Sequence, residues 1–317
     1  MNKIIATTNK ENFDIDGLSS ALALGDLLKM ENKEVEVVLE GKPDHSVTES
    51  LKNEEFRYTE KFSEPNENVD FAIVDTSNPV RFPHFVDIGK VVELYDHRAG
   101  FEKIWKNRIG KKARIEKVGA CATLIWEEYK KRGFAKKITS LNAGLMAAAI
   151  VSNTLNFRAS ITTERDRTAF RDLKSFAGFE NDWIEKYFTE RESAIYKNIE
   201  AAIKGDAFVQ EIPNSGIRIA IGQMELWRGK DFIKGHEKEI IKAMSSFKTS
   251  DWFFTLPSIS EGKNYLYAGS KEIEAMLENT LGIKFADRFG STSRLWLRKE
   301  MLEKILSPRQ SGERSPG

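Results

Sequence analysis

Acidic side chains and one histidine follow three short apolar runs near the start of the chain, and these residues are the best suited to chemistry. A pair of aspartates comes soon after residues 3–7, and the runs 71–74 and 91–94 are each followed by more. The residues concerned are Asp14, Asp16, Asp75, Asp96 and His97. Carboxylate and imidazole groups are common ligands of divalent cations in proteins. Gathered in one place, several buried carboxylates are costly unless cations neutralise them, so the pattern predicts a metal site.

Each position taken alone also has a plainer interpretation. Asp16 could cap the helix that is expected to follow it, because aspartate is common at helix N-termini. Asp75 and Asp96 could be ordinary turn residues at the ends of strands. The recurrence of the pattern after three strands, with His97 beside Asp96, favours the metal interpretation.

Alternating strand-like and helix-like segments in the first half of the chain would position these residues. Strands are expected at residues 3–7, 35–39, 71–74 and 90–94, and helices at 17–30, 119–131 and 138–151. This alternation predicts an α/β fold with a doubly wound parallel sheet and helices on both faces. Ligands collect at the carboxyl ends of parallel strands, which is where the acidic residues fall.

The second half of the chain predicts a smaller, mixed α/β domain. Residues 182–204 have a long, charged helical pattern; strands are then expected at 207–212, 217–222, 252–256 and 265–268, and helices at 231–247 and 271–279. We expect a metal-binding domain at residues 1–190 and a second domain at 191–306. The tail 307–317 is rich in Ser, Pro, Gly and Arg and is expected to be disordered.

Composition narrows the class of protein. The chain has 317 residues, with 49 Lys and Arg against 48 Asp and Glu, so its net charge of +1 argues against nucleic acid or an anionic membrane as the main partner. The only cysteine, Cys121, excludes an intrachain disulfide and a Cys-based zinc site and fits a reducing compartment. No signal peptide and no apolar run approaching the roughly 20 residues of a membrane span is visible. We therefore expect a cytoplasmic protein.

The acidic motifs resemble those of the DHH phosphoesterase superfamily, and most closely its manganese-dependent (family II) inorganic pyrophosphatases and related exopolyphosphatases. The likeness runs from residue 4 to about residue 305. The family's first three motifs are matched by Asp14 with Asp16, by Asp75, and by Asp96 with His97. Residues 118–123 resemble its Val-Gly-Ser-x-Ala-Thr segment, and residues 149–158 resemble its fourth motif.

The second half is similar to the pyrophosphatase-type C-terminal domain. Arg298 and Lys299 match the Arg-Lys phosphate clamp of that domain. The nuclease and nucleotide phosphodiesterase branch instead carries a Gly-Gly-x-His motif, and this chain contains no Gly-Gly pair. The resemblance therefore favours the pyrophosphatase branch.

Several positions depart from the family pattern. Lys10 stands where the family has its first histidine ligand, Arg98 replaces the second histidine of Asp-His-His, and Asn153 replaces the aspartate of the fourth motif. A lysine of the second domain falls on Phe208, with Lys204 the nearest cation. Loss of these ligands should weaken metal binding and shift preference from manganese towards magnesium. Lys10 and Arg98 could instead contact phosphate oxygens.

The resemblance implies hydrolysis of a phosphoanhydride, either pyrophosphate or a short polyphosphate, with two divalent ions of manganese or magnesium. Asp14 and Asp16 would bind different ions and Asp75 would bridge them. His97 would complete one site, oriented by Asp96, and Asn153 would take a further ligand position.

Cationic residues are then expected to bind the phosphate groups of a small phosphorylated substrate. They are Lys10, Arg98, Arg158, Lys204, Arg298 and Lys299. A homodimer is a further expectation. Two alternative functions stay open: a phosphodiesterase acting on short oligonucleotides or dinucleotides, and a non-hydrolytic protein that binds phosphate or nucleotide.

Overall fold

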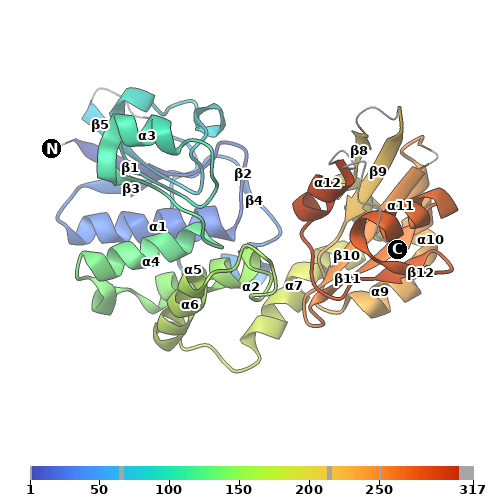
Figure 1. Ribbon diagram of the computed structural model, residues 1–317. Coiled ribbons are helices and arrows are strands. Elements are labelled where there is room, and N and C mark those ends of the chain that lie inside the picture. Colours follow the sequence, from blue (N-terminus) through green and yellow to red (C-terminus); the bar gives the residue numbers. More distant parts are fainter. Residues whose placement is uncertain (1, 64–67, 213–215, 250, 307–317) are drawn as a thin grey trace, which may run out of the picture. The chain divides into compact units, whose positions relative to one another are not determined.

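The computed structural model describes residues 2–63, 68–212, 216–249 and 251–306 (Figure 1). It divides into two units, Met1–Arg191 and Glu192–Gly317, with the boundary inside helix α7 (Trp183–Lys197). The tail expected at 307–317 lies outside the described residues. None of the helices in the described ranges combines the length and the apolar character that crossing a membrane requires.

A five-stranded sheet forms the centre of the first unit, and all of its neighbouring strands are parallel. The strands are β1 (Lys3–Thr7), β3 (Val35–Val37), β5 (Val69–Val74), β6 (Val91–Asp96) and β7 (Ala113–Ile115). Their order is β3-β1-β5-β6-β7, so the chain turns to one side of β1 first and to the other side later. This reversal confirms the predicted doubly wound sheet, and in such sheets ligands bind where the order reverses, here between β1 and β5.

Helices cover both faces of this sheet. In Figure 1, α3 (Glu102–Ile109) lies on one face, and α1 (Ile15–Met30) and α4 (Cys121–Lys131) lie on the other. The alanine-rich α5 (Ser140–Asn153) packs against α1, α4 and α6 (Glu164–Ala177), which explains why nearly all of it is buried. Three short elements complete the unit: β2 (Asn12–Phe13), β4 (Lys42–Pro43) and α2 (Glu49–Lys52).

A mixed six-stranded sheet forms the centre of the second unit, in the order β12-β13-β11-β10-β9-β8, which confirms the predicted mixed α/β domain but has two more strands than were expected. Only β9 and β10 pair in parallel. The strands are β8 (Phe208–Glu211), β9 (Arg218–Gln223), β10 (Asp251–Ser258), β11 (Lys263–Ala268), β12 (Lys284–Ala286) and β13 (Phe289–Ser291). The helices are α8 (Ile199–Asp206), α9 (Gly229–Gly235), α10 (Glu237–Ser245), α11 (Lys271–Leu281) and α12 (Arg298–Leu306).

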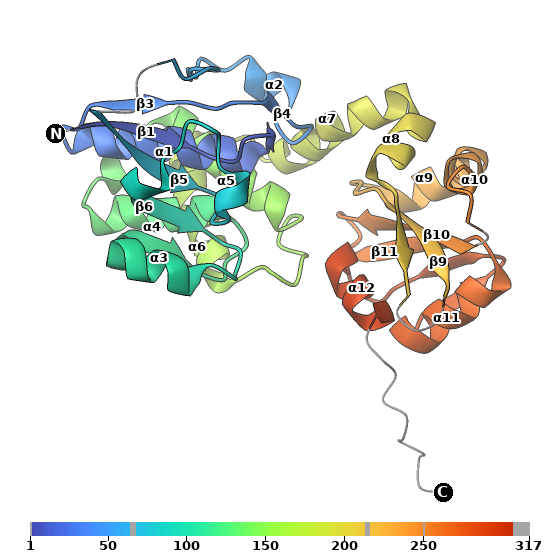
Figure 2. The ribbon, with the colours of Figure 1, turned by 90° about the horizontal axis from the view of Figure 1, so that it is seen from above.

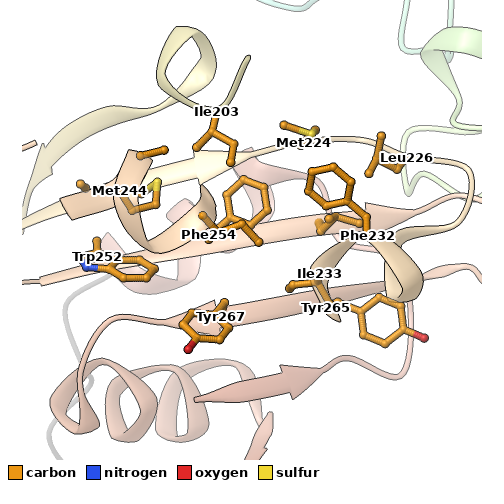
Figure 3. Close-up of a cluster of buried hydrophobic side chains, with 14 residues drawn as sticks. Ile203, Met224, Leu226, Phe232, Ile233, Met244, Trp252, Phe254, Tyr265 and Tyr267 are labelled. Carbon is orange, nitrogen blue, oxygen red and sulfur yellow. The ribbon is translucent and has the colours of Figure 1, made fainter. Parts of the chain in front are cut away.

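Both faces of the second sheet are covered, which gives this unit two apolar layers. Figure 2 shows α9 and α10 on one face and α11 and α12 on the other. In the first layer Phe254 of the sheet packs with Ile203 and Phe232 from the helices (Figure 3). In the second layer Phe253 and Leu266 of the sheet pack with α11 and α12.

Two predicted helices are wrong as single elements. The segment 182–204 is interrupted at Asn198, whose side chain accepts a hydrogen bond from Ala201 N at 3.0 Å and so caps α8. The segment 231–247 is interrupted at His236, between α9 and α10. Charged helical periodicity continued through both breaks, and therefore hid them.

Candidate metal centre

Asp75 lies directly after β5, beside the point where the strand order reverses. Its backbone has φ 55°, in the left-handed region that aspartate and asparagine enter more readily than most residues. Two hydrogen bonds hold this conformation: Asp75 N donates to Tyr95 O at 2.8 Å, and Arg98 Nη1 donates to Asp75 O at 2.6 Å. Such backbone strain is typical of functional positions that their surroundings hold in place.

Asp14 and Asp16 have different local roles at the start of α1. Asp14, not Asp16, is the N-cap, because its Oδ1 accepts from Gly17 N at 2.8 Å. Asp16 lies in the first turn and is fully buried. Its carboxylate accepts from the amides of Cys121 at 2.7 Å and Ala122 at 2.8 Å, at the N-terminus of α4, where backbone N–H groups stabilise negative charge.

The imidazole of His97 faces these carboxylates. Its Nδ1 lies 3.2 Å from Val118 O, and since a carbonyl can only accept, Nδ1 carries a proton and Nε2 is the nitrogen that can bind a metal once it is deprotonated. Nε2 lies 3.3 Å from Asp75 Oδ1 and 3.9 Å from Asp16 Oδ2, yet it is buried without a hydrogen-bond partner. A buried, unpartnered nitrogen aimed at two carboxylates is the arrangement expected of a metal ligand.

One divalent cation fits this arrangement. Asp16, Asp75 and His97 each offer a ligand atom, and these atoms lie within 4.8 Å of one another. The set combines two hard carboxylate oxygens with an imidazole nitrogen, which suits manganese or magnesium with water completing the shell. The residues predicted to form the metal site thus include a group that can hold one.

Electrostatics at the centre reflect crowded carboxylates. Burial raises the pKa of Asp16, and the neighbouring charge of Asp75 raises it further. Burial alone would lower the pKa of His97, but the adjacent Asp75 and Asp16 carboxylates outweigh it and raise the pKa to about 9. A cation bound among these groups would remove the repulsion between the two carboxylates.

Arg98 contacts Asp75 and Asp96. Its Nη1 donates to Asp75 Oδ1 at 2.8 Å and lies 3.5 Å from Asp96 Oδ1, while its backbone N donates to Asp96 Oδ1 at 3.2 Å. Burial alone would raise the pKa of Asp75, but the guanidinium, with His97, holds that pKa below its ordinary value. The ring of His97 is held by Val118, so Asp96 acts here on Arg98 and not, as expected, directly on His97.

Asn153, the last residue of α5, supports Asp16. Its Nδ2 donates to Asp16 Oδ2 at 2.8 Å. The backbone then makes a left-handed turn through Leu155, Asn156 and Phe157, with φ of 48°, 53° and 61°. The side chain expected as a metal ligand therefore serves as a hydrogen-bond donor in this structure.

The remaining predicted site residues are spread over both units. Lys10 lies between β1 and β2, and the exposed Arg158 follows the left-handed turn after α5. In the second unit, Lys204 Nζ pairs with Glu200 Oε1 at 2.6 Å, and Lys299 is 87% exposed.

Arg298, the other half of the expected clamp, has two partners in the second unit. Its Nη1 pairs with Asp206 Oδ2 at 2.6 Å. Its guanidinium carbon lies 5.3 Å from the ring centre of Phe208, the residue that stands where the family has a lysine. An aromatic face thus supports the cation at this position.

Backbone groups in the site were missed by reasoning from side-chain types. The amides of Cys121 and Ala122 and the carbonyl of Val118 hold two of the three ligands. Close packing at position 119 requires glycine, because an added Cβ would lie 2.4 Å from Thr154 Cγ2. The only signal was the family-like segment at residues 118–123.

Comparisons with known proteins identify the family. No family model matches the chain. A protein of Lactobacillus acidophilus, named a probable manganese-dependent inorganic pyrophosphatase, is 26% identical over 286 residues, or 87% of this chain and 89% of that protein. A protein of the same name from Bacillus cereus is 30% identical over 255 residues, or 78% of each chain. The chain therefore belongs to the manganese-dependent inorganic pyrophosphatases, as the resemblance of its motifs predicted.

Solved structures agree on the fold. A Methanococcus jannaschii protein assigned to the family II inorganic pyrophosphatases aligns with a TM-score of 0.62 at 19% identity, over 96% of this chain and 98% of that one. An exopolyphosphatase-related protein of Bacteroides fragilis aligns with a TM-score of 0.52 at 14% identity, over 96% and 90%. At these identities the likeness concerns the fold alone.

Proposed function

We propose that the chain hydrolyses the phosphoanhydride bond of inorganic pyrophosphate or a short polyphosphate, with a divalent metal held by Asp16, Asp75 and His97. The observation that carries the proposal is the convergence of these three ligand atoms within 4.8 Å, beside the reversal of strand order, in a chain of the pyrophosphatase family. A bound divalent ion would supply Lewis-acid polarisation of a phosphoryl oxygen and a water of lowered pKa.

The residues of the chain would position the substrate and balance its charge. Arg98 holds Asp75 through one nitrogen and is about half exposed, so its remaining N–H groups can donate to a phosphate oxygen. We assign the same role to Lys10 and Arg158 in the first unit and to Lys204, Arg298 and Lys299 in the second. Asp96, whose Oδ1 lies 3.5 Å from Arg98 Nη1, would keep the guanidinium oriented for this contact.

A non-hydrolytic phosphate-binding protein is the second candidate. It is favoured by Arg98 and Asn153, which already donate hydrogen bonds to Asp75 and Asp16, the carboxylates of the metal group. In this alternative the site would bind phosphate without cleaving it.

Phosphate release decides between these functions. Pyrophosphate, tripolyphosphate and a dinucleotide are each incubated with the full chain and manganese or magnesium. Release from pyrophosphate or tripolyphosphate that His97→Gln abolishes and His84→Gln leaves intact supports the proposal; His84 is an exposed histidine outside the metal group. Absence of release, together with saturable pyrophosphate binding, would establish the non-hydrolytic alternative. Mononucleotide formed from the dinucleotide alone, measured by chromatography because no inorganic phosphate is freed, would indicate a phosphodiesterase.

A further inference from the structure

Asp75 has two neighbours of different chemical kind. The Nε2 atom of His97 lies 3.3 Å from Asp75 Oδ1 and has no hydrogen-bond partner. The guanidinium of Arg98, in contrast, donates from Nη1 to both Asp75 O and Asp75 Oδ1. The first neighbour can give up a proton and bind a metal ion through Nε2, whereas the second is a cation that offers no ligand atom.

The guanidinium of Arg98 is stabilised by four nearby carboxylates. The carboxylates of Asp75, Asp96, Asp14 and Asp16 all raise its pKa, and Asp75 has the largest effect. Since an arginine is always charged, this positive charge is permanent at every working pH. A second divalent ion, bound on the side of Asp75 that the guanidinium occupies, would meet its repulsion at close range.

The other side chains at which the family would bind a second ion either have another hydrogen-bond partner or are of a different residue type. Asp14 Oδ1 accepts from Gly17 N as the helix cap. Asn153 turns its Nδ2 towards Asp16, and Lys10, which matches the position of the family's first histidine ligand, offers no ligand atom when protonated. By contrast, the three atoms offered by Asp16, Asp75 and His97 lie within 4.8 Å of one another.

We infer that the free chain holds one divalent cation, at Asp16, Asp75 and His97, and that the Arg98 guanidinium stands in place of a second. This inference rests on the proposed function, because it concerns the metals of that same site. The expectation of a divalent metal stands, and what changes is the number of ions that the chain holds without substrate. Arg98 is thereby a built-in positive charge that dilution or chelation cannot remove.

Counting bound manganese tests the inference without any reaction. The full chain, stripped of metal and held well above its dissociation constant, is titrated with MnCl₂ while electron paramagnetic resonance follows the free ion. We expect the free-ion signal to rise after one equivalent per chain. A break at two equivalents, or no binding at all, would overturn the inference.

Two variants, each with a matched control, show which residues determine the number of manganese ions bound per chain. His97→Gln should lose the bound ion, while the matched His84→Gln, at an exposed position, should keep one. Arg98→Gln should keep the first ion and bind a second that the parent does not. Arg171→Gln, an exposed arginine of α6, is its control. One ion in Arg98→Gln would overturn the role of the guanidinium, provided that circular dichroism shows the variant folded.

The metal count and the proposed function can fail separately. Phosphate release by a chain that binds two ions would overturn this inference and leave the function standing. One bound ion without phosphate release would support this inference and contradict the proposed hydrolysis.

Discussion

At the scale of single residues, Asp75 combines an unusual backbone with the central ligand position. Its left-handed φ of 55° suits aspartate and asparagine, so Asp75→Asn should keep the fold while it removes a ligand charge. We expect turnover to fall below about a tenth of the parent value, a barrier increase of more than about 1.4 kcal/mol. The measurement is phosphate release from pyrophosphate with manganese.

A comparison of two substitutions separates chemistry from backbone strain. Asp75→Ala should be equally inactive but also less stable, by about 1 kcal/mol, because alanine is strained at positive φ. Thermal melting of both variants without metal measures the difference. A fully folded Asp75→Asn protein with near-parental turnover would show that Asp75 is not a metal ligand.

Lys10 and Asn153 are the residues where the chain gives up potential metal ligands. The double substitution Lys10→His, Asn153→Asp restores an imidazole and a carboxylate, and should increase manganese affinity. Without metal it should be less stable than the parent, because the new carboxylate replaces an amide that donates to Asp16 at 2.8 Å.

One melting experiment can measure both the loss of stability without metal and the gain in manganese affinity. The double variant should melt below the parent in chelator and gain more from added manganese, since a ligand stabilises the state that binds it. Calorimetry that found unchanged or weaker manganese affinity would contradict the assignment of these two positions.

At the scale of elements, a buried ion-pair network joins β6 to the end of α4. Glu93 of β6 is 2% exposed; its Oε2 accepts from Arg132 Nη2 at 2.7 Å and its Oε1 from Lys112 Nζ at 2.9 Å. Burial alone would raise the pKa of Glu93, but Arg132 and Lys112 outweigh it and lower the pKa to about 2. The network anchors the strand that carries Asp96 and leads to His97.

A lowered pKa in the folded protein makes this stabilisation dependent on pH. The contribution of the Glu93 carboxylate is fully present above the ordinary pKa of 4.5 and is lost as pH falls towards about 2. Glu93→Gln should cost about 3 kcal/mol at pH 6, because it removes the buried carboxylate that pairs with both Arg132 and Lys112. The cost should shrink as the pH approaches 3.

Urea unfolding midpoints of parent and variant, measured from pH 6 to pH 3, check this prediction. Glu164→Gln is the control, because Glu164 is 86% exposed and its loss should change stability by less than about 0.5 kcal/mol. A gap between the parent and Glu93→Gln that stays constant with pH would contradict the assignment of the lowered pKa to Glu93.

At the scale of the whole molecule, we propose that Arg298 and Lys299 of the second unit bind the anionic substrate. We expect Arg298→Ala to reduce kcat/KM by about 2–4 kcal/mol of transition-state stabilisation, and to leave the number of bound manganese ions unchanged. Lys299→Ala should have a smaller effect, because lysine contacts phosphate as a point charge without the bidentate geometry of arginine.

Steady-state kinetics with pyrophosphate and manganese binding measure these two quantities. Lys271→Ala is the control, since Lys271 lies at the exposed start of α11. Near-parental kcat/KM in both Arg298→Ala and Lys299→Ala would assign the pair to an ordinary exposed helix start. Phosphate binding would then fall to Lys10, Arg98 and Arg158.

The sequence by itself determined the parallel sheet and the acidic strand ends of the first unit. Apolar runs such as residues 71–74 are buried on both faces and show their character locally, so β1, β5 and β6 were found. The three-residue strands β7, β12 and β13 were not, because so few residues have no detectable period, whereas the apolar run at the equally short β3 continues to residue 39. The helix breaks at Asn198 and His236 were hidden for the related reason that helical periodicity continues across them.

Only the tertiary structure decided which side chains of the acidic motifs meet and what each one does. Asp14 and Asp16 are two residues apart, yet one caps its own helix while the other accepts from amides more than a hundred residues away. Sequence spacing carries no information on such contacts, because they depend on where α4 begins relative to α1 in space. The same holds for Arg98: its type indicated a cation, and only the folded chain placed that cation on Asp75.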